Sequence, residues 1–275
     1  MHQNFDFSVG IYGAGHLCES FLVGLRQTTV QPVAIYNRTP DRIDLLRTRF
    51  RSLLPAKTLP ELVARGGLVF LFVPANAVLG MADEVLDLAR SHRTTFVSCV
   101  NGLSLSQIED RYPKIQIIKA VPNVLWQLLQ GITLVKVGRN VSSIHAEVFR
   151  KLVGRLSVLH DVDSEETFDR LSLFTSCGPG LFAELISQLF VGFAASTDTE
   201  RALLLQSITS TGLYIARSKC SPESVVHEVA RPGGLTEVGA DALRKSLPTA
   251  IAYVRACMAE KVTARRDEFA LQAAK

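Results

Sequence analysis

The feature that most constrains the fold of this chain is a glycine-rich stretch near its start, Gly10-Ile11-Tyr12-Gly13-Ala14-Gly15-His16-Leu17-Cys18. A short apolar run precedes it, and an amphipathic segment, 19–25, follows. This order predicts a strand, a tight turn and a helix. Glycines suit such a turn because they adopt φ angles that other residues resist, and they let the backbone approach a pyrophosphate at the helix start. The stretch therefore supplies six candidate cofactor-binding residues: Gly10, Gly13, Ala14, Gly15, His16 and Leu17.

An ordinary strand–helix turn can show the same glycine pattern, so the residues downstream decide its meaning. A second predicted strand, 32–36, ends in Asn37-Arg38-Thr39. An NAD site usually has an acid here, about 20 residues beyond the glycines, to hold the ribose 2′-hydroxyl. An acid would repel a 2′-phosphate, whereas Arg38 can pair with it and Thr39 can donate to it. We therefore expect NADPH to be preferred, with NADH possible, although Thr39-Pro40 also suits a plain helix start.

Composition sets the class of protein but not its activity. The chain has 275 residues, enough for two domains with an ample core, and its 47% hydrophobic and 20% charged residues are ordinary for a globular enzyme. The net charge of +4 is small, and no basic run interleaves with aromatic residues. We therefore expect no nucleic-acid partner.

Cysteine usage and hydrophobic patterning bear on the compartment. The five cysteines are scattered and lack Cys-x-x-Cys spacing, so we expect reduced thiols and no metal site. Residues 1–4 lack the layout of a signal peptide. The most hydrophobic stretch, 181–195, contains Glu184 and is short for a bilayer span. These observations predict a cytoplasmic protein with no membrane partner.

Alternating strand and helix patterns predict an α/β fold with a doubly wound parallel sheet. Apolar runs mark strands at 68–73, 94–100 and 115–121, with an edge-like strand at 131–137 and a last short strand at 158–162. Ligands bind at the carboxyl ends of the strands in such sheets. These ends add seven candidate cofactor-binding residues, although turn chemistry alone also collects such residues there: Val73, Pro74, Asn76, Asn101, Gly102, Pro122 and Asn123.

A shift to acidic composition places a domain boundary near Ser164. We expect a Rossmann-type dinucleotide-binding domain over 1–163 and an all-α dimerisation and substrate domain over 164–275. Predicted helices at 168–176, 180–197, 200–218 and 246–264 are apolar on several faces. Such helices need a partner, which predicts a homodimer and leaves a higher assembly of dimers open.

Several motifs in order resemble the pyrroline-5-carboxylate reductase family, and the likeness runs over nearly the whole chain. The glycine turn and Asn37-Arg38-Thr39 match the family's cofactor loops. Ala120-Val121-Pro122-Asn123 is similar to its Ala-Met-Pro-Asn segment, and Ser176-Cys177-Gly178-Pro179-Gly180 is similar to its Gly-Ser-Gly-Pro-Ala turn. Arg231-Pro232-Gly233-Gly234-Leu235-Thr236 resembles its Ser-Pro-Gly-Gly-x-Thr signature.

The resemblance implies NAD(P)H-dependent reduction of a cyclic imine, 1-pyrroline-5-carboxylate, to L-proline. It also implies that Thr236 is catalytic and lies beside the ring nitrogen of the substrate. Backbone N–H groups at a helix start suit a carboxylate, although the same residues can form a plain helix–helix turn with Thr236 as N-cap. The substrate-binding residues implied are Cys177, Gly178, Gly233, Gly234, Leu235 and Thr236.

Three other functions stay open at this stage. The chain has Val73 where the family has Lys, Cys177 where it has Ser, and Leu235 where many members carry a hydroxyl, which leaves a different cyclic imino acid open. A second possibility is a β-hydroxyacid dehydrogenase or ketopantoate-type reductase, but those families resemble one another in a helix lysine that 180–188 lacks. The third is a non-catalytic nucleotide-binding paralogue.

Overall fold

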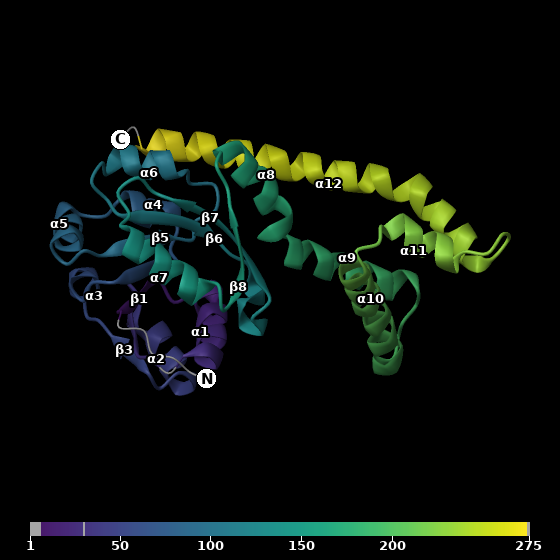
Figure 1. The fold of residues 1–275 in the computed structure, drawn as a ribbon, viewed down its shortest axis with the longest axis horizontal. Coiled ribbons are helices and arrows are strands. Elements are labelled where there is room, and N and C mark those ends of the chain that lie inside the picture. Colours follow the sequence, from purple (N-terminus) through teal and green to yellow (C-terminus); the bar gives the residue numbers. More distant parts are fainter. Residues whose placement is uncertain (1–6, 30, 274–275) are drawn as a thin grey trace. The chain divides into compact units, whose positions relative to one another are not determined.

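The computed structural model describes residues 7–29 and 31–273, and the N-terminal residues used above to judge a signal peptide lie outside this range (Figure 1). The chain divides into two compact units. The first extends to Pro179 and includes the chain again from Val262, and the second comprises Gly180–Lys261. The first unit takes in residues 165–175, which the expected boundary near Ser164 assigns to the second domain. The assignment of a cofactor domain and a substrate domain stays a prediction.

The first unit is built from alternating strands and helices. Its strands are β1 (Val9–Tyr12), β2 (Val33–Tyr36), β3 (Leu53–Pro55), β4 (Leu68–Leu71), β5 (Thr95–Ser98), β6 (Ile117–Val121), β7 (Gly131–Val137) and β8 (Ser157–Asp161). Its helices are α1 (His16–Thr28), α2 (Pro40–Arg49), α3 (Leu59–Ala64), α4 (Ala75–Leu79), α5 (Asp83–Ser91), α6 (Leu105–Arg111), the 3₁₀ helix η1 (Val124–Leu128), α7 (Ser143–Val153) and α8 (Glu165–Thr175).

The eight strands form one sheet in the order β3-β2-β1-β4-β5-β6-β7-β8. The six strands from β3 to β6 are parallel to one another, which confirms the predicted Rossmann-type arrangement. β7 is antiparallel to β6 and parallel to β8. The prediction of an edge-like strand at 131–137 is therefore wrong, because β7 lies between two neighbours and β8 forms the edge.

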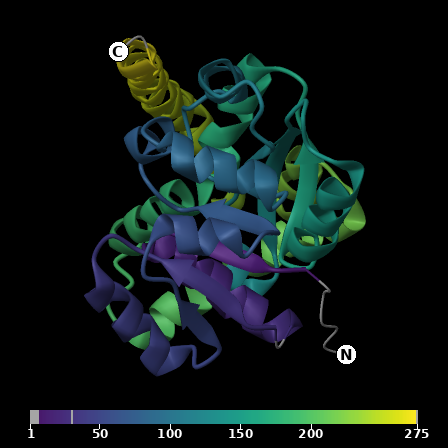
Figure 2. The same ribbon diagram turned by 90° about the vertical axis from the view of Figure 1, so that its left-hand side faces the viewer.

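Helices cover both faces of this sheet, as the continuous apolar character of its central strands requires (Figure 2). Every residue of β4, β5 and β6 is buried. One core cluster joins the sheet to side chains of α1, α2 and α7, and a second joins the opposite face to side chains of α3, α4, α5 and α6. These two layers hold the strands rigidly, so the loops at the strand ends start from fixed positions.

The second unit is helical within the described residues. It comprises most of α9 (Gly178–Gly192), α10 (Asp198–Ser218), α11 (Pro222–Val229) and α12 (Leu235–Ala273) up to Lys261. α10 has 21 residues and none of them is buried, although many are apolar. Among the described residues, no helix has the length and apolar character needed to cross a membrane.

Candidate cofactor and substrate sites

The loops that carry the predicted cofactor residues all leave the sheet at the edge formed by the carboxyl ends of its parallel strands. They follow β2, β1, β4, β5 and β6, which are consecutive and parallel in the sheet order. Parallel strands end at the same edge, so these loops gather there. The structure thus brings together at one edge the segments that hold Gly13–Leu17, Asn37–Thr39, Val73–Asn76, Asn101–Gly102 and Pro122–Asn123.

Gly13 is the residue on which the turn after β1 depends. Its φ of +106° is unfavourable for residues with a side chain, and its N–H donates to the Tyr36 carbonyl oxygen at 2.9 Å. A Cβ atom at Gly13 would lie 2.3 Å from the Phe72 carbonyl oxygen. The ends of three neighbouring strands therefore meet at this position, and only glycine fits between them.

Asn37 joins the glycine turn to the loop after β2. Its Oδ1 accepts from the Ala14 N–H at 3.1 Å, and its Nδ2 donates to the Thr39 carbonyl oxygen at 2.8 Å. One uncharged side chain thus orients both loops, at the strand end where an NAD-binding chain usually has an acid. This arrangement leaves Arg38 and Thr39 exposed beside the turn.

The start of α1 is open. Gly15 is the N-cap residue, no side chain caps it, and a Cβ atom built on it would have no neighbour within 4 Å. Gly15 and His16 are exposed. The first N–H groups of a helix have no intrahelical acceptor and carry partial positive charge. An anion such as a pyrophosphate fits this helix start.

Two aromatic rings border the open turn. The Tyr12 and Tyr36 rings lie 5.5 Å apart between centroids, at the ends of β1 and β2. Burial raises the pKa of the Tyr12 hydroxyl, the neighbouring Tyr36 raises it further, and the Arg38 guanidinium opposes the shift. The Tyr12 phenol is therefore neutral near pH 7, and the positive charge beside it comes from Arg38.

Three predicted residues have structural roles that the sequence did not reveal. Gly10 lies inside β1, where a Cβ atom would be 3.1 Å from both Leu62 and Val69, so its small size serves packing. Asn123 is only 3% exposed; its Nδ2 donates to the Thr175 carbonyl oxygen, and its Oδ1 accepts from two backbone N–H groups. Pro122 is buried beside it.

Cys18, at the position of the motif's third glycine, packs in the core and contacts no open surface. It is fully buried on α1, and burial raises the pKa of its thiol to about 12. The thiol is therefore protonated and unreactive near neutral pH.

One buried charged residue of β6 was not predicted from the sequence. Lys119 on β6 is 1% exposed, and its Nζ lies 2.6 Å from Oε2 of Glu165, the first residue of α8. Burial lowers the pKa of Lys119, and the Glu165 carboxylate opposes this shift. A lysine inside the apolar run of β6 was a visible signal in the sequence, but its partner lies 46 positions away.

The segment Arg231–Thr236 belongs to the second unit and leads into α12, which begins at Leu235. Gly233 has a φ of +73°, and its N–H donates to Glu237 Oε2 at 2.7 Å. The Gly234 N–H donates to the Arg231 carbonyl oxygen at 2.8 Å. Both amides predicted to face a substrate carboxylate are therefore engaged within the chain itself. The Thr236 side chain is exposed on the first turn of α12.

The other two predicted substrate residues, Cys177 and Gly178, lie in the first unit, where α8 ends and α9 begins. The Cys177 N–H donates to the Ser172 carbonyl oxygen at 3.2 Å. The predicted substrate residues thus fall into two groups, one in each unit.

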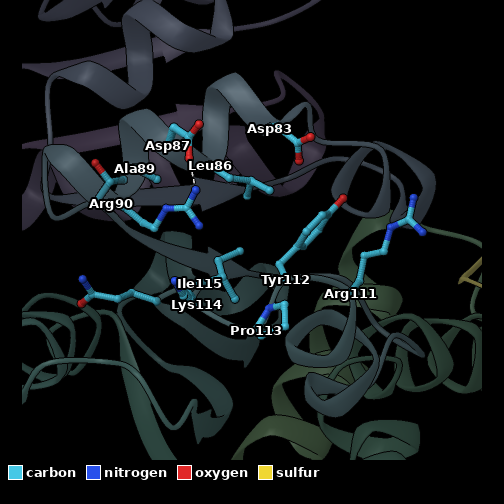
Figure 3. A pocket seen from close by; sticks show the side chains of 12 residues that line it. Asp83, Leu86, Asp87, Ala89, Arg90, Arg111, Tyr112, Pro113, Lys114 and Ile115 are labelled. Atoms are coloured by element: carbon cyan, nitrogen blue, oxygen red, sulfur yellow. Dashed lines mark hydrogen bonds and ion pairs between the residues drawn. The ribbon is translucent and has the colours of Figure 1, made fainter.

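A cavity of about 450 Å³ lies at the amino-terminal ends of β5 and β6. Residues of α5, of the segment Arg111–Gln116 and just before β5 line it (Figure 3). Because the glycine turn lies at the carboxyl ends of the parallel strands, this cavity is not the candidate cofactor site. Beside it Arg90 pairs with Asp87 on α5, and the Tyr112 hydroxyl donates to the Leu79 carbonyl oxygen.

No family model matches the chain. Pyrroline-5-carboxylate reductase 3 of Danio rerio is 24% identical, over 88% of this chain and 85% of the relative. Pyrroline-5-carboxylate reductase 2 of Bacillus subtilis is 25% identical, over 86% of this chain and 87% of the relative. The chain is therefore similar to these reductases over most of its length.

A solved structure supports the same fold. The pyrroline carboxylate reductase of Plasmodium falciparum, crystallised with NADP bound, has a TM-score of 0.79 and is 17% identical, with 98% of each chain covered. The likeness therefore extends over both units, from the Rossmann-type sheet to the helical second unit.

Proposed function

We propose that this chain is an NADPH-dependent reductase of a cyclic imine, and that it converts 1-pyrroline-5-carboxylate to L-proline. The observation that carries the proposal is the likeness to named pyrroline-5-carboxylate reductases over 86–88% of the chain. The open helix start beside an uncharged Asn37 and an exposed Arg38 adds to it, since these features suit a phosphorylated dinucleotide.

The residues at the sheet edge fit such a cofactor. The N–H groups at the start of α1, from Gly15 to Leu17, would hold the pyrophosphate, and Arg38 and Thr39 would hold the 2′-phosphate. The loops after β4 and β5, with Val73–Asn76 and Asn101–Gly102, would hold the rest of the dinucleotide. When bound, NADPH supplies the hydride that reduces the C=N carbon.

The second unit would supply the group nearest the reacting nitrogen. A protonated imine loses its positive charge as it becomes an amine, so a neutral hydroxyl that both donates and accepts suits both ends of the reaction. Thr236 has such a hydroxyl, and it is exposed. The charged Glu237 is unsuited because a fixed carboxylate would stabilise the charged ground state.

The substrate carboxylate would lie against the loop Gly233–Leu235, with Cys177 and Gly178 as further contacts. The Gly233 N–H already donates to Glu237. Glu237 must therefore release this amide before a substrate carboxylate can use it. The same loop also offers the exposed guanidinium of Arg231.

We further propose that the working enzyme is a cytoplasmic homodimer that forms through the second unit. Large apolar side chains of this unit are exposed, for example Val191 at 74%, Phe193 at 72%, Leu203 at 67% and Tyr253 at 72%. Exposed apolar area of this extent is unusual on a monomer and typical of a protein interface.

The test is oxidation of NADPH by the purified protein in the presence of three kinds of substrate. We expect turnover with 1-pyrroline-5-carboxylate and little with 2-oxo acids. Faster turnover of a different cyclic imino acid would identify that compound as the substrate in place of 1-pyrroline-5-carboxylate. Turnover of a carbonyl compound in place of imines would refute the proposed reaction. Tight NADPH binding with no turnover of any substrate would identify a non-catalytic paralogue.

A further inference from the structure

The ion pair between Lys119 and Glu165 has more connections than a simple salt bridge. Glu165 Oε2 lies 2.6 Å from Lys119 Nζ, and its Oε1 accepts from the Leu105 N–H at 3.1 Å. Oε1 also lies 3.5 Å from Lys136 Nζ on β7. One carboxylate, on the first residue of α8, thus links β6, β7 and the start of α6.

Burial of Lys119 stabilises its ion pair with Glu165. Lys119 is 1% exposed, and its Nζ lies 4.2 Å from the centre of the Phe168 ring. Burial of an ammonium without a nearby negative charge is unfavourable, so the Glu165 carboxylate stays paired with Lys119. The same burial keeps Lys119 from exchanging protons with a substrate. Its role is therefore to hold other groups in place.

The group that this pair holds is the loop between β5 and α6. The loop begins after Ser98, whose Cα is paired in register with Lys119. It ends at Leu105, whose N–H donates to the Glu165 carboxylate. Between these ends lies Asn101–Gly102, the predicted cofactor segment, in which Gly102 has a φ of +83°. The Lys119–Glu165 pair therefore borders both ends of this loop.

At the C-terminal end of the loop, Leu103 and Leu105 pack into the core, and few side-chain hydrogen bonds add to this packing. Ser104 and Gln107 form a capping box, which orients the helix start but not its attachment to the sheet. Among the buried polar side-chain atoms of the described residues, the Ser98 hydroxyl oxygen is the one without a hydrogen-bond partner. Glu165 thus links the first N–H of α6 to the Lys119 side chain of β6 through its two carboxylate oxygens.

We propose that Glu165 and Lys119 are positioning residues for cofactor binding, which act by fixing the loop 99–104 at the edge of the sheet. This inference rests on the proposed function, because it requires that the loop contacts the bound dinucleotide. Neither residue touches the cofactor or the substrate in this account.

The test measures the dissociation constant of NADPH by nicotinamide fluorescence, together with kcat, in four variants. Glu165→Gln keeps an oxygen for Leu105 but removes the carboxylate charge that pairs directly with Lys119, and Lys119→Met removes the ammonium. We expect both to weaken NADPH binding about tenfold, because displaced positioning groups have effects of this order or larger. Lys119→Arg should restore most of the affinity. Lys136→Met is the matched control, since this half-buried lysine contacts the same carboxylate from β7 but does not border the loop.

A double-variant cycle separates positioning from general stability. If Glu165 acts through the loop, Glu165→Gln should weaken NADPH binding in the parent and much less in an Asn101→Ala background. A lower melting temperature with an unchanged dissociation constant in both charge variants would overturn the inference and leave the pair a structural one. Equal weakening in both backgrounds would also overturn it. A parent protein that does not bind NADPH at all would refute the proposed function itself.

Discussion

Removal of the Arg38 guanidinium should weaken NADPH binding and leave NADH binding nearly unchanged. Arg38 follows the strand end at which Asn37 replaces an acid, and its side chain is exposed. A hydrogen bond to a charged group contributes about 1.5–3 kcal/mol, and solvent screening of an exposed arginine favours the lower end. We therefore expect Arg38→Ala to cost about 1.5 kcal/mol for NADPH, which is about a tenfold rise in its dissociation constant.

Two controls make this prediction specific. Arg42→Ala removes another exposed arginine, on α2, and should leave the affinity for both cofactors unchanged. Asn37→Ala removes the hydrogen bonds that join the two loops, and it should weaken NADH and NADPH alike. The assay is a fluorescence titration of each variant with both cofactors. Equal loss of both cofactors in Arg38→Ala, or a parent that prefers NADH, would refute the assignment of the 2′-phosphate to this loop.

Four further outcomes follow from the structure. Thr236→Ala should lower kcat/KM for the imine about tenfold to a hundredfold with NADPH affinity retained, while Thr236→Ser should keep most activity. Gly13→Ala should lower the free energy of unfolding by about 2 kcal/mol or more in urea titrations, because of its positive φ and the close Phe72 carbonyl. In native protein at pH 8 a thiol reagent should leave buried Cys18 unmodified until the first unit unfolds. Sedimentation should find a dimer at micromolar concentration, and a folded, active monomer would contradict the proposed assembly.

The first unit was predictable to the extent that its structure follows from local patterns. The glycine turn, the apolar strands and the polar strand ends each occupy a few consecutive residues, and the parallel topology then gathers the loops at one edge. The pairing of β7 was not predictable in this way. Whether Gly131–Val137 lies at the edge depends on where β8 adds, and no periodicity within the strand records this.

The sites show the same division between local and distant information. The residue types at the glycine turn follow from backbone geometry, and the structure explains Gly13 and Asn37 directly. The partners of Lys119 and Asn123 come from α8, far along the chain, so their roles appear only after folding. At Gly233 the backbone amide donates to Glu237 on the following helix turn, a hydrogen bond that the sequence analysis did not predict. The sequence feature that could have indicated this hydrogen bond is a carboxylate four residues after the glycine.

In the proposed reaction, a hydride from NADPH reaches the carbon of a C=N bond in a cyclic imino acid. The test supplies NADPH deuterated at the transferred position together with 1-pyrroline-5-carboxylate, and the product is characterised by mass spectrometry and NMR. We expect L-proline with one deuterium on the ring carbon that was double-bonded to nitrogen. Unlabelled proline, or no proline while NADPH is oxidised by a carbonyl compound, would contradict the proposed reaction.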